Sequence, residues 1–423
     1  MTDNGNQPRP ARTLTVKNFS VIKEAKLEFG KITVLIGPQS SGKSLLCKLA
    51  YFFSQFTPEF ANNIARRHPS FLELSDAIRD RFVEWFPQSA WGDGRAEISY
   101  TDGSYSPSVS IAGPESAPLL RFDPRFSSDF ERWKEADRIG VDPAQERELP
   151  RGPYHSAGSI YVPSGRSFFS TPNRGFVSAS EKNLDWITQR FSTELDWDYK
   201  ALISAGNVRI TALGEFGVQA AEILGGKVVK EGSVLLFIPE NSSRKLQFQL
   251  LSSGTLELLP LLNPLSQRVS DSTINDSLGT NILPTYPNGI VFVEEPELGV
   301  FPKTQNQLVR LFAWSANTFR NGPSLTITTH SPYILTAFND LIKAGLIAEE
   351  QPDKASEVEK IIPRHYWIRP GDFAAYAFDG KDGILRPIMD EETKMINGDI
   401  LDDISSDIAD QFGQLLEIQY GGR

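Results

Sequence analysis

The segment GPQSSGKS, residues 37–44, decides the fold of this 423-residue chain. It fits the phosphate-binding pattern G-x-x-x-x-G-K-[ST], in which glycines let the backbone wrap its N–H groups around an anion. The apolar run ITVLI at residues 32–36 precedes it, and residues 43–53 are predicted to form a helix. A strand, a glycine-rich turn and a helix start in this order predict an α/β core with a phosphate site at the end of a buried strand.

Three later segments supply groups that a phosphate loop lacks: LSSG at residues 251–254, IVFVEEPE at 290–297 and TTHS at 328–331. The last two contain or follow short apolar runs, which predict two further buried strands. LSSG places two hydroxyls and a glycine at a predicted helix start, which makes a second anion site. A nucleotide already surrounded by the first loop leaves no room for that second site. We therefore expect LSSG to close on the nucleotide of a second subunit.

Composition limits the class of protein. Hydrophobic residues make up 40% and charged residues 23%, as in ordinary globular proteins. No apolar run approaches the roughly 18 residues that span a bilayer, and the N-terminus lacks a signal-peptide core, so we expect a cytoplasmic protein without membrane contact. Cys47 is the single cysteine, which excludes an intrachain disulfide. The net charge of −10 disfavours a nucleic-acid-coating surface, although basic residues near the N-terminus leave local DNA binding open.

Each polar group in these segments has a predicted task in ATP hydrolysis. Lys43 can bridge the β- and γ-phosphates, and Ser44 can place its hydroxyl on Mg²⁺. Glu294 ends an apolar strand and is the predicted Mg²⁺ carboxylate, while Glu295 is the predicted general base. His330 follows a buried strand and can contact the γ-phosphate. The predicted catalytic residues are thus Glu295, His330 and Lys43, and the predicted metal ligands are Ser44 and Glu294.

Each motif also has a plainer interpretation. LSSG alone could be a capped helix, the glutamate pair an acidic loop, and His330 a strand-end cap. The occurrence of all four segments in one order favours the functional interpretation.

The four segments resemble those of an ABC-type ATPase head, and in particular the branch with SMC-type and OLD-type (overcoming-lysogenization-defect) ATPases. The diagnostic stretches are EEPE at residues 294–297, then Pro302 and Gln305, and TTHSP at residues 328–332. The resemblance implies an α/β fold: a P-loop head with a mixed sheet core, an antiparallel β subdomain and helical insertions. It also implies a head-to-tail dimer, or a higher homo-oligomer, that holds ATP and Mg²⁺ between its subunits.

The family's functional residues map onto this sequence one by one. Residues 37–44 match the Walker A loop, residues 252–254 the signature motif, Glu294 and Glu295 the Walker B acid and catalytic glutamate, and His330 the switch histidine. Glu297 would lie in a loop that faces the partner head. The predicted nucleotide-binding residues are Gly37, Pro38, Gln39, Ser40, Ser41, Gly42, Lys43, Ser44, Leu45, Ser252, Ser253, Gly254 and Arg166, the last from the segment VPSGR, which resembles a recurrent arginine segment of these ATPases.

The chain departs from the family pattern at three places. Phe301 stands where the branch usually has a histidine, and Thr255 where many signatures have glutamine. The 93 residues after His330 (423 − 330) hold no convincing array for a Toprim nuclease domain, so we expect an ATPase without its own nuclease. The Walker A region resembles the ATPase subunit of the phage anti-restriction-induced system. That resemblance implies a separately encoded effector, such as a Toprim-like nuclease, and a phage protein as trigger.

Other functions stay open at this stage. A DNA repair or recombination ATPase that clamps duplex DNA is the main alternative, and the acidic charge weighs against it. A nucleotide-binding scaffold with little turnover is a further alternative, against which Glu295 and His330 argue.

The sequence predicts these segments: a tail at 1–11, an N-terminal head lobe at 12–56, a helical and β-hairpin insertion at 57–158, a head continuation with helical insert and signature at 159–262, a mobile loop at 263–288, a C-terminal head lobe at 289–380 and a helical segment at 381–423.

Overall fold

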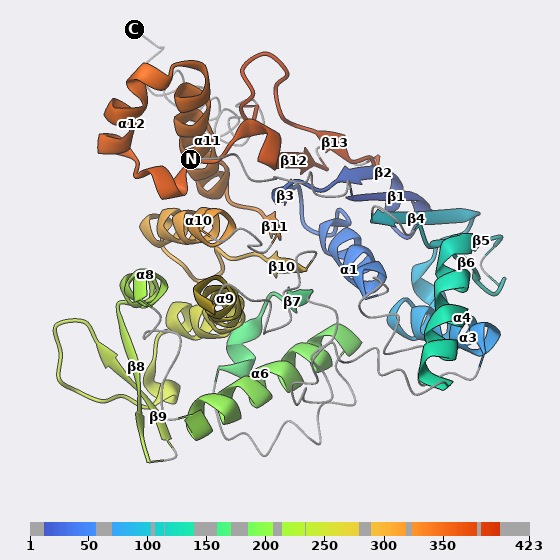
Figure 1. Cartoon of the computed structure of the whole chain (residues 1–423), viewed down its shortest axis with the longest axis horizontal. Coiled ribbons are helices and arrows are strands. Elements are labelled where there is room, and N and C mark those ends of the chain that lie inside the picture. The colour runs from blue at the N-terminus through green and yellow to red at the C-terminus, as the bar shows by residue number, and fades with distance from the viewer. Residues whose placement is uncertain are drawn as a thin grey trace, which may run out of the picture.

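The computed structural model describes residues 12–55, 70–102, 106–113, 115–138, 159–170, 185–205, 214–232, 234–278, 289–318, 324–378 and 382–397. The predicted tail at 1–11 and the predicted helix near the C-terminus lie outside these ranges. Within them, the chain forms a mixed six-stranded sheet, an antiparallel five-stranded sheet and a two-stranded hairpin, with helices around them (Figure 1).

The six-stranded sheet has the strand order β13-β12-β3-β11-β10-β7. Its strands are β3 (Ile32–Ile36), β7 (Ile160–Val162), β10 (Ile290–Glu294), β11 (Ser324–Thr329), β12 (Phe373–Ala377) and β13 (Arg386–Pro387). Five of them run parallel, and only β13 pairs antiparallel, with β12. Every residue of β3, β10 and β11 is buried, as expected for parallel strands covered on both faces.

Two hydrophobic cores cover the two faces of this sheet. Val34 packs into one core with residues of α9, α10 and α11, whereas Leu35 packs into the other with residues of α1 and of the antiparallel sheet. Successive side chains of a strand point to opposite faces, so the apolar run of β3 serves both cores. The helices concerned are α1 (Lys43–Ser54), α9 (Ser253–Leu278), α10 (Pro302–Asn317) and α11 (Pro332–Glu350).

The antiparallel sheet contains strands from the predicted insertion at 57–158. Its order is β2-β1-β4-β5-β6, and β4 pairs with β1 from Arg12 to Lys17, with Val16 opposite Ile98. Strands β4, β5 and β6 therefore continue the sheet of the N-terminal lobe, because alternate apolar residues of β4 share the core of β1. Its elements are β1 (Arg12–Phe19), β2 (Ile22–Glu28), β4 (Ala96–Asp102), β5 (Ser108–Ile111) and β6 (Leu119–Arg121), flanked by helices α3 (Phe71–Trp85) and α4 (Pro124–Arg138).

One predicted loop differs from the structure. The predicted mobile loop at 263–288 is helical up to Leu278, and Leu265 and Val269 of this part of the helix are buried in the core. Of the predicted segment at 381–423, the described residues 382–397 contain β13 and turns.

The remaining elements are α6 (Trp186–Ala205), α8 (Gly214–Leu224), α12 (Ala355–Ile361) and the hairpin of β8 (Gly226–Glu231) and β9 (Val234–Pro239). Of these elements, α6 and α8 contact α9, and α12 contacts α11. The two sheets and their helices confirm the predicted fold class, an α/β P-loop head of the ABC type with an antiparallel β subdomain and helical additions. No helix among the described residues is both long and apolar enough to cross a membrane.

Candidate active site

Three adjacent parallel strands bring the sequence motifs to one edge of the sheet. Ile36, the last residue of β3, lies opposite Thr329, the last residue of β11. Glu294, the last residue of β10, lies opposite Thr328. The phosphate loop, the glutamate pair and His330 therefore follow the carboxyl ends of neighbouring parallel strands. Open α/β sheets bind their ligands at this edge.

The phosphate loop needs its two glycines for steric reasons. Gly37 and Gly42 have φ values of 153° and 107°, which residues with a side chain rarely adopt. A Cβ atom on Gly37 would lie 2.6 Å from the carbonyl oxygen of Phe378, and one on Gly42 would lie 2.8 Å from Ile22. The loop is thus fixed between β12 and the antiparallel sheet, with Pro38, Gln39 and Ser40 exposed and Ser44 and Leu45 half-buried at the start of α1.

Lys43 points its ammonium group back into this loop. Its Nζ atom donates to the carbonyl oxygens of Gly37 and Pro38, both at 2.8 Å, and the residue is 5% exposed. Burial lowers the pKa of Lys43, and the negative charges of Glu295, Glu297 and Glu294 oppose this shift.

Polar atoms of the loop also fit a phosphate group. The hydroxyl of Ser41 is buried and has no hydrogen-bond partner among the described residues. A buried hydroxyl of this kind needs an acceptor or donor. Phosphate oxygens would provide an acceptor.

Glu294 is held by two donors that the sequence did not identify. The hydroxyl of Tyr161 donates to Oε1 at 2.6 Å, and the backbone N–H of Ser164 donates to Oε2 at 3.0 Å. Burial raises the pKa of Tyr161, and the charge of Glu294 raises it further, so the phenol remains a donor. Glu294 is 5% exposed and both carboxylate oxygens already accept a hydrogen bond, which suits a Mg²⁺ contact through water.

Glu295 has an unusual backbone conformation. Its φ of 42° lies in the left-handed region, which costs a residue with a side chain about 1–3 kcal/mol. Its N–H donates to the carbonyl of Thr328 at 2.8 Å. Its Oε1 atom lies 3.6 Å from Nε2 of His330, and the two side chains are 30% and 35% exposed. The predicted base and the switch histidine therefore lie together at an accessible edge.

Glu297 binds residues of the segment 329–331 in the same chain, which is called the switch segment below. Its Oε1 atom accepts from the hydroxyl of Thr329 at 2.8 Å and from the N–H of His330 at 2.7 Å. Gln305 adds a second link, because its Oε1 accepts from the hydroxyl of Ser331 at 2.6 Å. The family resemblance implies that Glu297 lies in a loop facing a partner head; within this chain, its Oε1 atom binds residues 329 and 330.

Arg166 differs most from its predicted role. It was assigned to nucleotide binding, but it is 0% exposed, and its guanidinium donates to the carbonyls of Pro163, Glu294, Glu295 and Glu257. A guanidinium whose nitrogens bind backbone carbonyls in the interior holds elements together. The sequence pattern showed a special arginine but could not show which groups it binds.

The signature segment, residues 251–254, leads into α9. It lies beside the Walker B loop, residues 295–301, which follows β10. The hydroxyl of Ser252 accepts from the N–H of Thr255 at 3.2 Å and so caps the helix. Ser252 and Ser253 are exposed. A Cβ atom on Gly254 would lie 2.5 Å from the carbonyl oxygen of Gly299, so only glycine permits this contact.

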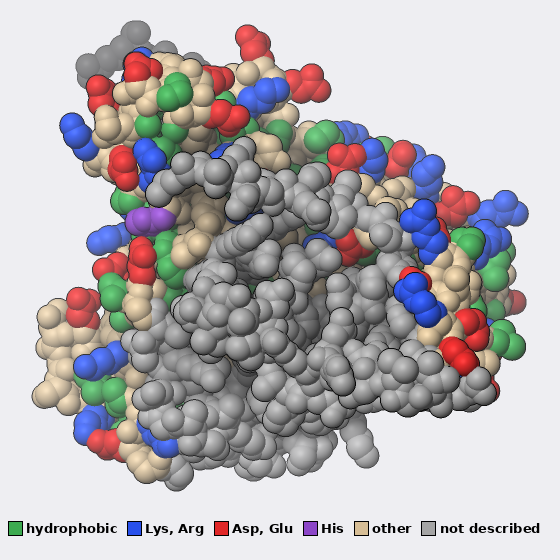
Figure 2. All heavy atoms as spheres, viewed as in Figure 1, with side chains coloured by type: hydrophobic (Ala, Val, Ile, Leu, Met, Phe, Trp, Pro, Cys, Tyr) green, Lys and Arg blue, Asp and Glu red, His purple; other side chains and the backbone are tan. Residues whose placement is uncertain are grey.

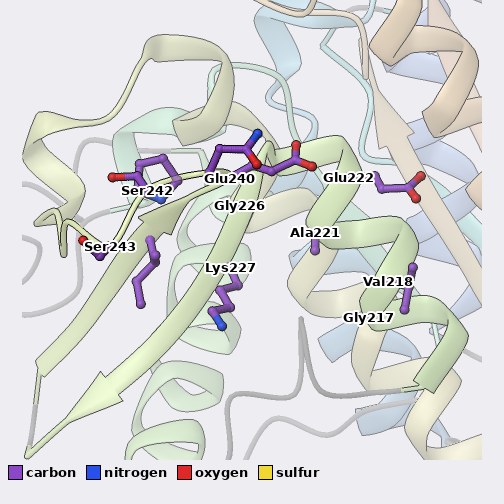
Figure 3. Close-up of a pocket in the computed structure, with 12 residues that line it drawn as sticks. Gly217, Val218, Ala221, Glu222, Gly226, Lys227, Glu240, Ser242 and Ser243 are labelled. Atoms are coloured by element: carbon purple, nitrogen blue, oxygen red, sulfur yellow. The ribbon is translucent and has the colours of Figure 1, made fainter.

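A cavity of about 690 Å³ lies away from this edge, between α8 and the β8–β9 hairpin. Figure 3 shows its lining, which includes Val218, Glu222, Lys227 and Glu240. None of the predicted site residues lines it, so its size does not make it the candidate active site.

The fold and the motif geometry define an ATPase domain of the ABC type. Residues 32–336 match the family described as "AAA domain, putative AbiEii toxin, Type IV TA system". This match covers more than half of the chain, so the chain belongs to that family. A comparison with curated proteins gave no match.

Solved structures with a related fold include three at low sequence identity. A head of SMC bound to the C-terminal winged-helix domain of ScpA is 12% identical, with a TM-score of 0.43, covering 91% of this chain and 100% of that one. The SMC head domain from Thermotoga maritima is 12% identical, with a TM-score of 0.38 and coverages of 90% and 98%. The recombination mediator protein RecF is 10% identical, with a TM-score of 0.37 and coverages of 90% and 99%.

Proposed function

We propose that this chain binds ATP with Mg²⁺ and hydrolyses it between two copies arranged head to tail. The convergence of Lys43, Glu295 and His330 at the ends of β3, β10 and β11 carries this proposal. In each copy the 37–44 loop would hold the triphosphate. Residues 252–254 of the other copy would close on it, since their hydroxyls are exposed at a helix start.

Ser44 and Glu294 are the residues that would hold Mg²⁺. Glu294 would act through water, because Tyr161 and Ser164 already bind its two oxygens. When bound, the ion would neutralise negative charge on the phosphates. Tyr161 and Ser164 hold the Glu294 carboxylate in position.

Glu295 would act as the general base. It takes a proton from water as the water oxygen attacks the γ-phosphorus, and the bond between that phosphorus and the bridging oxygen breaks to release ADP and phosphate. Lys43 stabilises negative charge on the phosphates, and His330, 3.6 Å from the Glu295 carboxylate, would contact the γ-phosphate. The hydrogen bonds from Thr329 and His330 to Glu297 hold this histidine in position.

The hydrolytic cycle would serve as a switch. ATP bridges two surfaces that ADP cannot bridge equally well, so closure reports the nucleotide state. We propose that closure controls a separately encoded cytoplasmic effector, such as a Toprim-like nuclease, in anti-phage defence, with a phage protein as trigger. The family description names a toxin–antitoxin system, which supports a role in a system of at least two gene products.

Phosphate release tests the hydrolytic part of this proposal. Glu295→Gln removes the base and should lower turnover at least 100-fold, while Glu350→Gln, a matched change at an exposed position on α11, should leave turnover unchanged. Wild-type turnover in Glu295→Gln would exclude the assigned base.

Binding experiments test the switch against its main alternative. The purified chain, with ATP and Mg²⁺, should bind the protein encoded beside it and release it after hydrolysis. Strong binding of a short DNA duplex with a steep salt dependence, without binding of that protein, would favour a DNA clamp. On the face shown in Figure 2, acidic and basic side chains are interspersed among the described residues, which does not favour DNA.

A further inference from the structure

Arg166 joins two parts of the chain that the proposed function assigns to different nucleotides. It lies in a 3₁₀ turn, Arg166–Phe169, that follows β7, and it is fully buried. Nη1 donates to the carbonyl of Glu294 at 2.8 Å, and Nη2 donates to that of Glu295 at 3.3 Å. Nε donates to the carbonyl of Glu257 in α9 at 3.0 Å. One guanidinium therefore holds the end of the Walker B strand and the first turns of the signature helix.

The link to α9 includes a charge. Oε2 of Glu257 lies 3.8 Å from Nε of Arg166, and both side chains are buried. Burial lowers the pKa of Arg166, and the charge of Glu257 opposes this shift most strongly. A charge in the interior is stable only when it is paired and hydrogen-bonded, so α9 and Arg166 depend on one another.

The link to β10 acts on the predicted base. Glu295 keeps its left-handed conformation between two hydrogen bonds, one from its N–H to Thr328 and one from Arg166 to its carbonyl. Such a conformation persists only where the surroundings hold it. A shift of Arg166 would therefore move the Glu295 backbone and change how its carboxylate lies beside His330.

A second contact joins the same two elements. Gly254 of the signature helix packs so closely on Gly299 of the Walker B loop that a Cβ atom would lie 2.5 Å from the Gly299 oxygen. The start of α9 therefore cannot move toward the loop that carries Glu295 without displacing it. This steric contact and the guanidinium connect α9 to the end of β10 and its loop at two points.

We infer that Arg166 is a positioning residue that couples the two ATP sites of the dimer, an inference that rests on the proposed function. When residues 252–254 of one copy engage the ATP of the other, α9 shifts against the partner nucleotide. Arg166 transmits this shift to Glu295 of its own copy, which serves that copy's own ATP. Each site thus becomes active when the other is filled, and hydrolysis is cooperative in ATP.

The ATP dependence of turnover tests this coupling. We expect a Hill coefficient above 1.5 for the wild type. Arg166→Lys keeps the charge but loses the planar fork that reaches both elements, so the Hill coefficient should fall to about 1 and kcat at least tenfold. Arg12→Lys is the matched control, because Arg12 is also buried and paired, with Asp102, within the antiparallel sheet. Its Hill coefficient should match the wild type.

ATP affinity separates coupling from general damage. In a Ser253→Arg background, which should block closure on the partner, the affinity for ATP should change less than twofold on adding Arg166→Lys. If Arg166→Lys does not fold, Glu257→Gln weakens only the α9 half of the link and should give an intermediate Hill coefficient.

Two results would overturn the inference: a folded Arg166→Lys protein with the Hill coefficient and kcat of the wild type, or a wild-type Hill coefficient of 1. A wild type without turnover would instead refute the proposed function, and the coupling with it.

Discussion

Removing the hydroxyl of Tyr161 should raise the Mg²⁺ requirement of hydrolysis as well as lower the stability of the fold. Tyr161→Phe deletes the 2.6 Å hydrogen bond to Oε1 of Glu294, a carboxylate that is 5% exposed. A hydrogen bond to a buried charged group contributes about 1.5–3 kcal/mol, so the free energy of unfolding should fall by about 2 kcal/mol. Partners that orient a metal-binding carboxylate typically affect metal affinity by about 10–100-fold. We therefore expect the Mg²⁺ concentration for half-maximal hydrolysis to rise by at least tenfold.

Tyr376→Phe is the matched control for this change. Tyr376 is also largely buried, and its hydroxyl donates to the carbonyl of Glu28 at 3.1 Å and accepts from the N–H of Glu28 at 3.0 Å. Its loss should cost about 1 kcal/mol of unfolding free energy and leave the Mg²⁺ requirement unchanged. Urea unfolding measures the first quantity, and Mg²⁺ titration of phosphate release measures the second. Equal Mg²⁺ requirements in the wild type and Tyr161→Phe would refute the assigned role of Glu294.

Three further predictions follow from contacts around the site. Glu297→Gln weakens the charge-assisted bonds to the switch segment and should lower kcat about tenfold with little change in ATP affinity; a lower affinity with unchanged kcat would contradict this role. Gly254→Ala places a methyl group 2.5 Å from the Gly299 oxygen and should lower unfolding free energy by about 1–3 kcal/mol, as urea unfolding would show; a wild-type value would mean that the loop can move. Burial raises the pKa of Tyr100 and of Tyr161 above the usual value near 10, so the unfolded chain releases these protons first. Stability should then hold below about pH 10 and fall above it, by up to about 1.4 kcal/mol per pH unit for each tyrosine, with a shallower fall in Tyr161→Phe.

The sequence predicted the centre of the fold because local and global signals agree there. Short runs of strand-forming residues at β3, β10 and β11 predicted buried strands, and each strand is followed by a motif with polar atoms. Lys43, Glu295 and His330 were predicted as site residues on this basis, and the structure brings their segments to one edge of the sheet.

Predictions failed where the deciding contact is distant in sequence. The pairing of β4 with β1 joins residues about 80 positions apart, and no local signal in residues 57–158 shows it. The second half of α9 is polar enough to suggest a loop, yet the helix continues to Leu278, with Val269 buried in the core. The hydrophobic periodicity of a short stretch of sequence reveals neither the distant pairing nor the burial.

The candidate site shows the same limit. Tyr161 lies 133 residues from Glu294, and Arg166 lies 91 residues from Glu257. A motif can mark a residue as special, but it cannot say whether the side chain faces a ligand or another strand. Arg166 was recognised as special and given the wrong partner for that reason.

Assembly in the presence of nucleotide tests the central claim most directly, because two copies must share each ATP. Light scattering should show a mass near 47.1 kDa for Glu295→Gln with ADP and about twice that mass with ATP and Mg²⁺. Ser253→Arg, which places a bulky charge at the exposed start of α9, should remain at the single-copy mass with ATP while still binding it. A single-copy mass for Glu295→Gln under saturating ATP, together with normal turnover in Ser253→Arg, would contradict hydrolysis at a shared site.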